Sequence, residues 1–399
     1  MTHKERLLRA LRYQAVDHLP TQVNYTARMG RLLAMHFGVS TGELPAALDN
    51  HLVRVDLSLP ERLSADGLVR FDWWGAGHDT AEEGYYIRFS PLADRRDLDA
   101  FAWPDPNASG LLNDAARTLA AHSEYFVVPN LGFALFERAW SLRGFEQFFM
   151  DMALDPGFAA ELLDRITEIQ LGLIRRFIAL GVDGGYFGDD YGAQKGLLFS
   201  PRTWRQLIKP RLARLFAPFR ERGLPILMHS DGQIQQILPD LVEIGLTALN
   251  PVQPEVLDHA WLRKNFGGRL AFYGGVSTQT VLPHGTPAEV RQAVAACIRD
   301  PQAGNTMAAQ LRIHHRGGIA RRAHSAGAHR VEDGRADRAG GVGQFLVALE
   351  RGAGLIFLGA IAGHRLGRHD PAGQADRARC GQAVAGGGEV VRRDLGRAH

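Results

Sequence analysis

The sequence feature that most constrains the fold is a repeated pattern in which a short apolar run ends in polar residues and is followed by helical spacing. The clearest copy lies in residues 223–253, where the run Pro225–Met228 leads directly into His229, Ser230 and Asp231. The run is too short for an isolated helix and is bounded by glycine and proline, so it predicts a buried strand. The amphipathic spacing that follows predicts a helix ending at Gly245.

The same pattern recurs in neighbouring parts of the chain. Predicted strands end near residues 189, 229, 250 and 274, one helix separates each from the next, and polar residues follow each strand end. Polar groups at the carboxyl ends of parallel strands are typical of active sites in α/β proteins. The repetition favours a (β/α)8 barrel, the TIM-barrel fold, over a flat sheet. We predict this barrel domain over residues 1–303.

Turn and capping signals predict several further elements. Asp155 and Pro156 are typical of a helix start, and Gly181 is typical of a helix end. Proline inside a helix removes one backbone hydrogen bond and favours a bend. The expected elements are a strand over Thr21–Tyr25, a hairpin or flap over residues 68–89, a long helix over residues 156–180, and a helix that starts at Ser200 and bends at Pro210.

The composition is that of a soluble globular protein, with 45% hydrophobic and 22% charged residues. No apolar run approaches the length of about 18 residues that a membrane span needs. The N-terminal segment MTHKERLLRALRYQ carries charges in place of a signal-peptide apolar core. We therefore expect a cytoplasmic protein with no membrane partner. The two cysteines, Cys297 and Cys380, are too few for a disulfide framework or a thiolate zinc cluster.

Residues 304–399 differ in composition from the rest of the chain. They contain 19 Gly, 18 Ala, 15 Arg and 7 His but only 8 acidic residues. Because this segment is so basic, the pI of 9.0 does not indicate nucleic-acid binding by the predicted barrel. The segment lacks helical and strand periodicity, which predicts an irregular Gly/Ala/Arg-rich tail. An alternative hypothesis is translation out of frame beyond about residue 304, which would leave the eighth barrel strand and the last helix missing or replaced.

Candidate functional residues follow the predicted strand ends. Asp189 and Asp190 are adjacent, so one carboxylate should face the barrel mouth while the other turns toward the wall. The inward carboxylate could bind substrate N–H groups, act as a general base or bind a cation. His229 and Asp231 are two residues apart, which places both on one face of a continued strand. A histidine beside a carboxylate is suited to metal binding or proton transfer.

Residues near the next strand end are candidates for substrate binding. Asn250, Gln253 and Glu255 offer amide and carboxylate groups that could orient a substrate or support a metal ligand. Tyr191 and Gln194 follow the aspartate pair, and Tyr191 could cover the pocket. The sequence shows no phosphate-binding P-loop, nucleophile elbow or His-Glu-x-x-His pair, so ATP hydrolysis, acyl hydrolysis and zincin chemistry are poorly supported.

Several segments together resemble the uroporphyrinogen decarboxylase superfamily. The resemblance covers residues 3 to about 300 and implies a (β/α)8 barrel with its cleft at the carboxyl ends of the strands. The segments are K-E-R-L-L-R-A-L-R, V-D-H-L-P, G-D-D-Y-G-A-Q, S-P-R-T-W-R, M-H-S-D-G, L-N-P-V-Q-P and F-Y-G-G-V-S-T-Q.

The resemblance implies one of two chemistries, of which methyl transfer is the one we expect. In the corrinoid-dependent methyltransferases of the superfamily a zinc ion activates a thiol or methyl donor, and their signature resembles His-x-Cys with a second Cys near the last strand. Here His229 matches, and Asp231 stands in place of the first Cys. We expect methyl transfer between a small methylated substrate and a corrinoid carried by a partner protein. His229 and Asp231 would bind zinc or act as acid/base groups, and Asp189 or Asp190 would orient the substrate.

Decarboxylation of a uroporphyrinogen-type tetrapyrrole is the alternative reaction. The resemblance implies that it needs no cofactor and uses an aspartate, here Asp189 or Asp190, to hold pyrrole N–H groups. The decarboxylases bind the substrate carboxylates with a segment similar to R-Q-A-G-R-Y, where this chain has Thr26-Ala-Arg-Met-Gly-Arg31. A barrel without catalysis, as a damaged gene product or an interaction subunit, is a third hypothesis.

Overall fold

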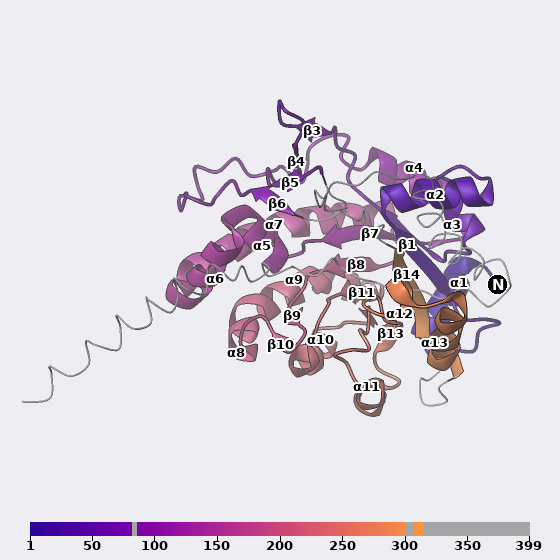
Figure 1. Cartoon of the computed structure of the whole chain (residues 1–399). Coiled ribbons are helices and arrows are strands. Elements are labelled where there is room, and N and C mark those ends of the chain that lie inside the picture. The colour runs from indigo at the N-terminus through magenta and orange to yellow at the C-terminus, as the bar shows by residue number, and fades with distance from the viewer. Residues whose placement is uncertain (82–85, 300–306, 314–399) are drawn as a thin grey trace, which may run out of the picture. The chain divides into compact units, whose positions relative to one another are not determined.

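The computed structural model describes residues 1–81, 86–299 and 307–313, all within the first of two compact units, residues 1–361 (Figure 1). Its centre is a sheet of eight parallel strands in the order β1-β14-β13-β12-β11-β8-β7-β2. Thr21 and Asn50 form a parallel bridge between the two ends of this order, so the sheet closes into the predicted (β/α)8 barrel. The strands are β1 Thr21–Tyr25, β2 Leu52–Val55, β7 Phe126–Gly132, β8 Gly185–Gly188, β11 Ile226–His229, β12 Ala248–Asn250, β13 Ala271–Tyr273 and β14 Met307–Ile313.

Buried side chains complete the junction between β1 and β2. Val23 N donates to Asn50 Oδ1 at 2.5 Å, and Asn50 Nδ2 donates to Val23 O at 3.0 Å. Leu52 N donates to Gln22 Oε1 at 2.9 Å. These side chains satisfy backbone groups that a regular ladder would otherwise pair, which is how the barrel closes across a short bridge.

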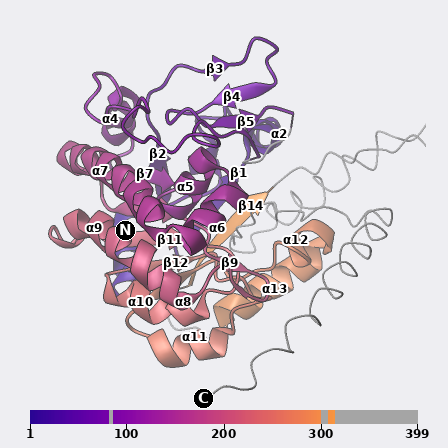
Figure 2. The ribbon, with the colours of Figure 1, turned by 90° about the vertical axis from the view of Figure 1, so that its left-hand side faces the viewer.

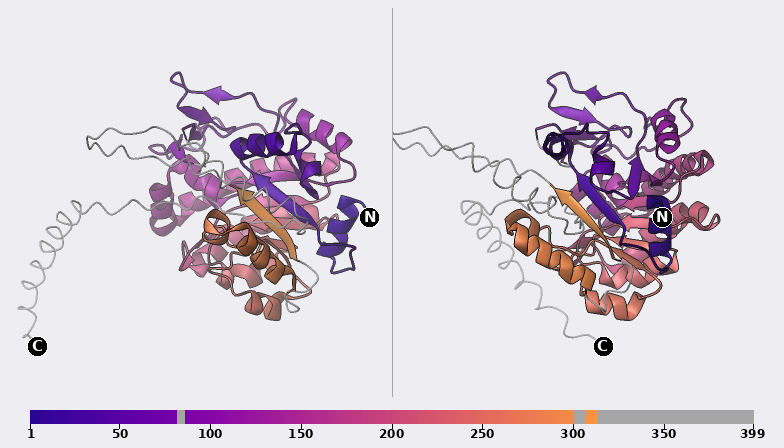
Figure 3. Two further views of the ribbon diagram at one scale, coloured as in Figure 1. Left: turned by 45° about the vertical axis from the view of Figure 1, so that its right-hand side comes forward. Right: turned by 90° about the vertical axis from the view of Figure 1, so that its right-hand side faces the viewer.

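The eighth strand, β14, pairs in parallel with both β1 and β13, and Figure 3 shows it beside β1. It lies just after residue 304, in the segment where the out-of-frame hypothesis expected this strand to be missing or replaced. The structure therefore has an eighth strand in the place that closure requires. The predictions about the last barrel helix and about most of the basic tail concern residues 314–399, which lie outside the described residues.

Helices flank the barrel strands along the chain (Figure 2). The long helix α7 has the predicted bounds because Asp155 Oδ1 accepts from Phe158 N at 3.1 Å and Gly181 adopts a left-handed φ of 97°. Among the described helices, none combines the length and apolar character needed to cross a membrane. The helices are α1 His3–Leu11, α2 Ala27–Phe37, α3 Leu44–Ala47, α4 Asn113–Ala121, α5 Phe136–Arg143, α6 Phe145–Leu154, α7 Pro156–Leu180, α8 Pro201–Thr203, α9 Lys209–Arg220, α10 Leu238–Glu243, α11 His259–Phe266, α12 Val281–His284 and α13 Pro287–Arg299.

The helix predicted to start at Ser200 is irregular next to Pro210. A π-helical turn, Trp204–Ile208, joins α8 to α9, and Pro210 is the second residue of α9. Proline has no N–H to continue the ordinary ladder, which accounts for the irregular turn at this place. The predicted helix after β11 forms as a 3₁₀ turn, Gln235–Ile237, followed by α10. Its predicted apolar stripe is buried and comprises Ile234, Ile237, Leu238, Leu241 and Ile244.

The lower half of the barrel lumen is apolar, and α1 closes its amino end. Leu7 and Leu11 of α1 pack with residues at the beginning of the strands, including Leu52 and Leu227. Two tyrosines of this interior cluster, Tyr186 and Tyr273, mark the level at which the lumen becomes polar. The strand residues of the cluster are Leu52, Phe126, Val128, Tyr186, Leu227, Ala248, Ala271 and Tyr273.

A four-stranded antiparallel sheet confirms the hairpin or flap expected over residues 68–89. Asp72, which follows β4, accepts a hydrogen bond from Arg138 of α5 and pairs with His78 at 3.2 Å. The Arg138 guanidinium carbon lies 5.2 Å from the Trp74 ring centroid. These contacts fix the sheet to the helix that follows β7. The strands are β3 Arg62–Leu63, β4 Val69–Phe71, β5 Gly77–Asp79 and β6 Ile87–Phe89.

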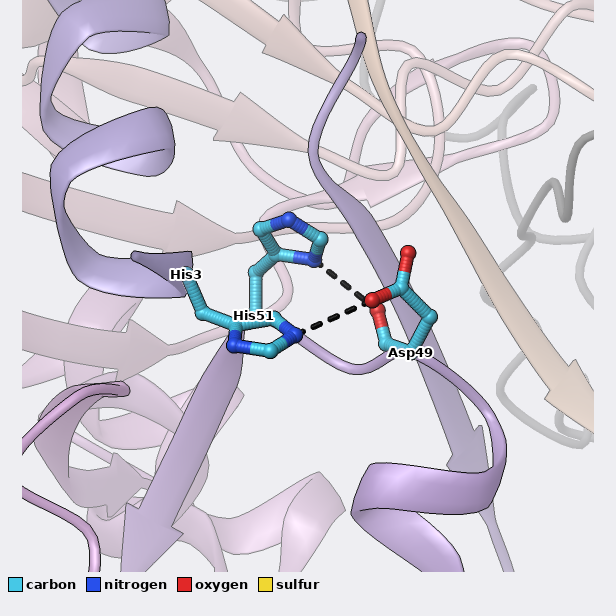
Figure 4. Close-up of side chains that lie close together, drawn as sticks. All are labelled: His3, Asp49 and His51. Carbon is cyan, nitrogen blue, oxygen red and sulfur yellow. Dashed lines mark hydrogen bonds and ion pairs between the residues drawn. The ribbon is translucent and has the colours of Figure 1, made fainter. Parts of the chain in front are cut away.

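A histidine cluster lies at the amino end of the barrel, where His3, Asp49 and His51 approach one another (Figure 4). Arg6 Nη1 lies 2.9 Å from His51 Nε2, and arginine can only donate. His51 Nε2 is therefore the acceptor, which leaves the proton on Nδ1; Nδ1 lies 2.8 Å from Asp49 O, to which it can donate, and 3.2 Å from Thr21 N. Because both ring nitrogens of His51 are engaged in this way, the cluster is a hydrogen-bonded plug in which His51 is a poor metal ligand.

Because His51 is buried in this plug, we predict that the protein loses stability in mild acid. Burial lowers the pKa of His51 to about 4, against the opposing charge of Asp49. The folded protein therefore binds this proton less readily than the unfolded chain, and the stabilisation that is present above about pH 6.5 is lost as pH falls toward 4. We expect the free energy of unfolding to fall by about 2 kcal/mol between pH 6.5 and pH 5 from this group.

Urea unfolding at the two pH values measures this effect. A His51→Gln variant, which does not titrate, should show a smaller difference between the two pH values than the parent protein. Equal pH dependence in both proteins would contradict the assignment.

Candidate active site at the carboxyl end of the barrel

The neighbouring strands β8 and β11 bring a histidine and two aspartates together at the barrel mouth. Gly188 at the end of β8 is in register with His229 at the end of β11. His229 Nε2 lies 3.9 Å from Asp190 Oδ1 and 3.8 Å from Asp231 Oδ1. One possible ligand atom from each of the three residues lies within 4.8 Å of the others. As predicted, His229 and Asp231 face the same place, and Asp190 joins them.

Asn250 fixes the orientation of the His229 ring. Asn250 Nδ2 donates to Tyr273 O at 2.7 Å, so its Oδ1 is the atom that faces His229 Nδ1, at 2.6 Å. An amide oxygen only accepts, so Nδ1 of His229 carries the proton in this arrangement. Nε2 is then the basic nitrogen, and it is turned toward Asp190 and Asp231. A neutral imidazole whose other N–H donates to an oxygen is the usual form of a metal-binding histidine.

The two adjacent aspartates face different ways, as the sequence predicts, but only Asp190 belongs to this cluster. Asp189 is completely buried and accepts hydrogen bonds from the backbone N–H groups of Leu135, Phe136 and Glu137 at 3.2, 2.9 and 2.8 Å. Burial raises its pKa to about 6, and these hydrogen bonds oppose the rise. Asp189 thus caps the start of α5 from a neighbouring strand, in place of the predicted catalytic role.

Tyr191 supports Asp189 and does not cover a pocket. Its side chain is completely buried, and its hydroxyl donates to Asp189 Oδ2 at 2.8 Å. Its ring lies near those of Phe136 and Trp204, with centroids 6.4 and 5.8 Å away. The alternation of β8, continued in the extended residues after Gly188, turns Asp190 toward the mouth and Tyr191 into the packing between barrel and helices. The predicted substrate contact at Tyr191 is therefore corrected.

Glu137 is an acidic neighbour of the site that the sequence analysis missed. It lies in the first turn of α5, and its carboxylate forms a hydrogen bond with the backbone N–H of Asp190. Burial raises the pKa of Glu137 well above its usual value, and the charges of Asp190, Asp189 and Asp231 raise it further. The available signal was an acidic residue in the first turn of the helix after β7. Four apolar residues, 133–136, separate Glu137 from the strand end, so Glu137 did not stand out as a residue at a strand end.

The cluster concentrates negative charge in a largely buried place. Burial raises the pKa of Asp190 to about 7, the charge of Asp231 raises it as well, and His229 opposes the rise. The side chains of Asp190 and Asp231 keep 17% and 20% of their surface exposed, so solutes can reach them. Crowded carboxylates of this kind are stabilised by a proton or by a cation.

The remaining predicted residues lie around the cluster at different distances. Gln253 Oε1 accepts from Gly232 N at 3.2 Å, and its Nε2 donates to the exposed Gln194 at 3.1 Å, so both support the loop that carries Asp231. Glu255 is exposed and accepts from Ser277 Oγ on the next loop. The loop that carries Asp231 also packs against Gly192, where a Cβ atom would lie 2.7 Å from Asp231 O. Gln253 and Gln194 therefore act on loop geometry, and Glu255 lies outside the three-residue cluster.

Comparison with known proteins places the chain in a family. The sequence profile of the family described as uroporphyrinogen decarboxylase (URO-D) matches residues 2–308, well over half of the chain. The chain belongs to the uroporphyrinogen decarboxylase family. This confirms the resemblance found in the sequence and the TIM-barrel fold.

Among solved structures similar to this uroporphyrinogen decarboxylase family member, the one with the TM-score above 0.5 supports the fold. A methyltransferase from Methanosarcina mazei is 19% identical in sequence, with a TM-score of 0.58, over 77% of this chain and 92% of the other. A B12-independent methionine synthase from Shewanella sp. W3-18-1 is 12% identical, with a TM-score of 0.35, over 50% of this chain and 58% of the other. No curated protein matches the chain in sequence.

The site fits the metal that the methyltransferase branch of the uroporphyrinogen decarboxylase family implies, with a different donor set. The carboxylate of Asp231 lies where the His-x-Cys signature has a thiolate, and it faces His229 Nε2 at 3.8 Å. Asp190 adds a second carboxylate from β8. One imidazole nitrogen and two carboxylates can hold Zn²⁺ or another divalent first-row ion, and they form a harder ligand set than one with thiolates.

Proposed function

We propose that this protein transfers a methyl group between a small methylated substrate and a corrinoid carried by a partner protein, using a divalent cation, Zn²⁺ in the first instance, at the barrel mouth. The observation that carries the proposal is the fixed His229 tautomer, whose basic Nε2 faces Asp190 and Asp231. The family and the similarity to a methyltransferase fold support it.

The residues of the chain would divide the work in the following way. His229, Asp231 and Asp190 would hold the cation, and Asn250 would keep the imidazole in the required tautomer. When bound, the cation would supply Lewis-acid chemistry that makes a thiol or a methyl-bearing heteroatom more reactive. Gln253 would hold the loop that carries Asp231 through its bond to Gly232 N.

The assay for this proposal is demethylation of methylcobalamin by a panel of small thiols, followed by visible absorbance. Zinc-loaded protein should catalyse it, and protein treated with a chelator should not. Asp231→Asn removes the charge of one ligand and should lower the rate at least about tenfold. The matched control is Asp66→Asn, at an exposed aspartate of the antiparallel sheet, which should leave the rate unchanged.

Two other results would replace the proposal. Release of CO2 from a uroporphyrinogen by chelator-treated protein, without any methyl transfer, would assign the alternative decarboxylation. Folded protein that does neither reaction would favour a barrel without catalysis.

A further inference from the structure

The loop that carries Asp231, residues 230–233, is bound to its neighbours through four consecutive backbone N–H groups. Two of the acceptors follow β8, and the other two lie at the end of β12 and just after it. The loop is therefore held from both sides, and its N–H groups are satisfied without any helix or sheet ladder. The bonds are Ser230 N to Asn250 O at 2.9 Å, Asp231 N to Asp190 Oδ1 at 2.9 Å, Gly232 N to Gln253 Oε1 at 3.2 Å and Gln233 N to Ala193 O at 2.8 Å.

Two glycines face each other where this loop meets the loop after β8. A Cβ atom at Gly192 would lie 2.7 Å from Asp231 O and from Gln233 N. A Cβ atom at Gly232 would lie 2.4 Å from the carbonyl carbon of Gly192. All of these neighbours are backbone atoms, which cannot turn aside as the end of a flexible side chain can. Glycine at both positions therefore allows the two backbones to approach this closely.

The two glycines are required for different reasons. Gly232 has a φ of 82°, in the left-handed region that favours glycine whatever the space around it. The φ of Gly192 lies outside that region, so only the contact between the loops excludes a side chain there. Gly192 is two residues after Asp190, and Gly232 directly follows Asp231. A change in the packing of these glycines would therefore move the carboxylates beside them.

We propose that Gly192 is a positioning residue of the metal site, because its lack of a side chain sets the spacing between Asp190 and Asp231. The proposal rests on the proposed function and adds the residue that fixes the geometry of its carboxylate ligands. The two carboxylates lie 3.9 and 3.8 Å from His229 Nε2 in the packing that Gly192 allows.

The size of the expected shift supports this role. Ordinary contact of a Cβ atom begins at 3.4 Å, so a methyl group at Gly192 would push the backbone atoms 2.7 Å away by about 0.7 Å. Metal ligands need to be held to within about 0.5 Å of the productive geometry. Gly192→Ala should therefore disturb the ligand set although it changes no ligand.

Hydrogen exchange of residues 230–233, followed by mass spectrometry on chelator-treated protein, tests the loop packing apart from any metal. In the parent these amides should exchange at least about a hundredfold more slowly than in an unstructured peptide. Gly192→Ala should speed their exchange at least about tenfold. The matched control is Gly132→Ala at the end of β7, where a Cβ atom would lie 3.9 Å from Asn130 Oδ1, and it should have no effect.

Zinc affinity of the same proteins, measured by competition with a chromophoric chelator, gives the second readout. Gly192→Ala should bind zinc about 10–100-fold more weakly than the parent and Gly132→Ala. Urea unfolding would show whether the variant is folded under these conditions. A glycine with a merely structural role would lower stability without changing the zinc affinity of the folded protein.

Equal exchange rates, or equal zinc affinities, in the parent and a folded Gly192→Ala protein would overturn the inference. If Gly192→Ala does not fold, exchange in the parent decides, and unprotected amides at residues 230–233 would overturn it. Parent protein that binds no zinc but shows the expected exchange rates would contradict the proposed function and support the packing role of Gly192. The two failures are therefore distinguishable.

Discussion

Replacing Asp189 with alanine is expected to lower the free energy of unfolding by about 3–5 kcal/mol. The change removes the acceptor of three backbone N–H groups at the start of α5 and of the Tyr191 hydroxyl, all in a buried place. Each buried donor left without an acceptor costs about 1–3 kcal/mol, and partial rearrangement reduces the sum. The carboxylate also lies at the positive end of the helix dipole, which adds to the loss.

Urea unfolding at pH 7.5 measures this effect. Asp189→Asn, which keeps one side-chain oxygen, should be destabilised less than Asp189→Ala. Asp99→Ala, at a surface aspartate with 81% of its side chain exposed, should change stability little. A change below about 1 kcal/mol in Asp189→Ala would contradict the structural role of Asp189 and reopen its predicted catalytic role.

Replacing His229 with alanine is expected to lower the methyl-transfer rate by at least about a thousandfold, since it removes the only nitrogen ligand of the proposed set. His229 is 8% exposed at a strand end, and the cavity left there opens toward the mouth, so the barrel should still fold. Asn250→Ala should have a smaller effect, about 10–100-fold in metal affinity, because it releases the ring without removing it. A His229→Ala protein with the parental rate would exclude the imidazole from the chemistry.

The sequence predicted the barrel and part of the site because both follow from local patterns. Strand ends are marked by glycine, proline and polar residues, and parallel strands bring their carboxyl ends to one edge. His229, Asp231 and Asp190 meet for this reason, through the pairing of Gly188 with His229. The orienting role of Asn250 follows from the next pair in the same sheet, His229 with Asn250.

The remaining errors came from contacts that local patterns do not encode. The sequence could not tell which of Asp189 and Asp190 faces the mouth, because the strand alternation fixes only that they differ. Tyr191 was assigned to the pocket because an aromatic residue after a strand end suits either a lid or a core position. Glu137 was missed because it lies four apolar residues beyond a strand end.

Metal content tests most directly whether His229 and its neighbouring carboxylates bind a divalent metal. The protein, His229→Ala and His18→Ala, which removes an exposed histidine at the opposite end of the barrel, would be dialysed against Zn²⁺, desalted and measured by plasma mass spectrometry. We predict about one zinc ion per chain in the parent and in His18→Ala, and less than about a tenth of that in His229→Ala. Folded parent protein without zinc, or equal zinc in the parent and His229→Ala, would contradict metal binding at this site.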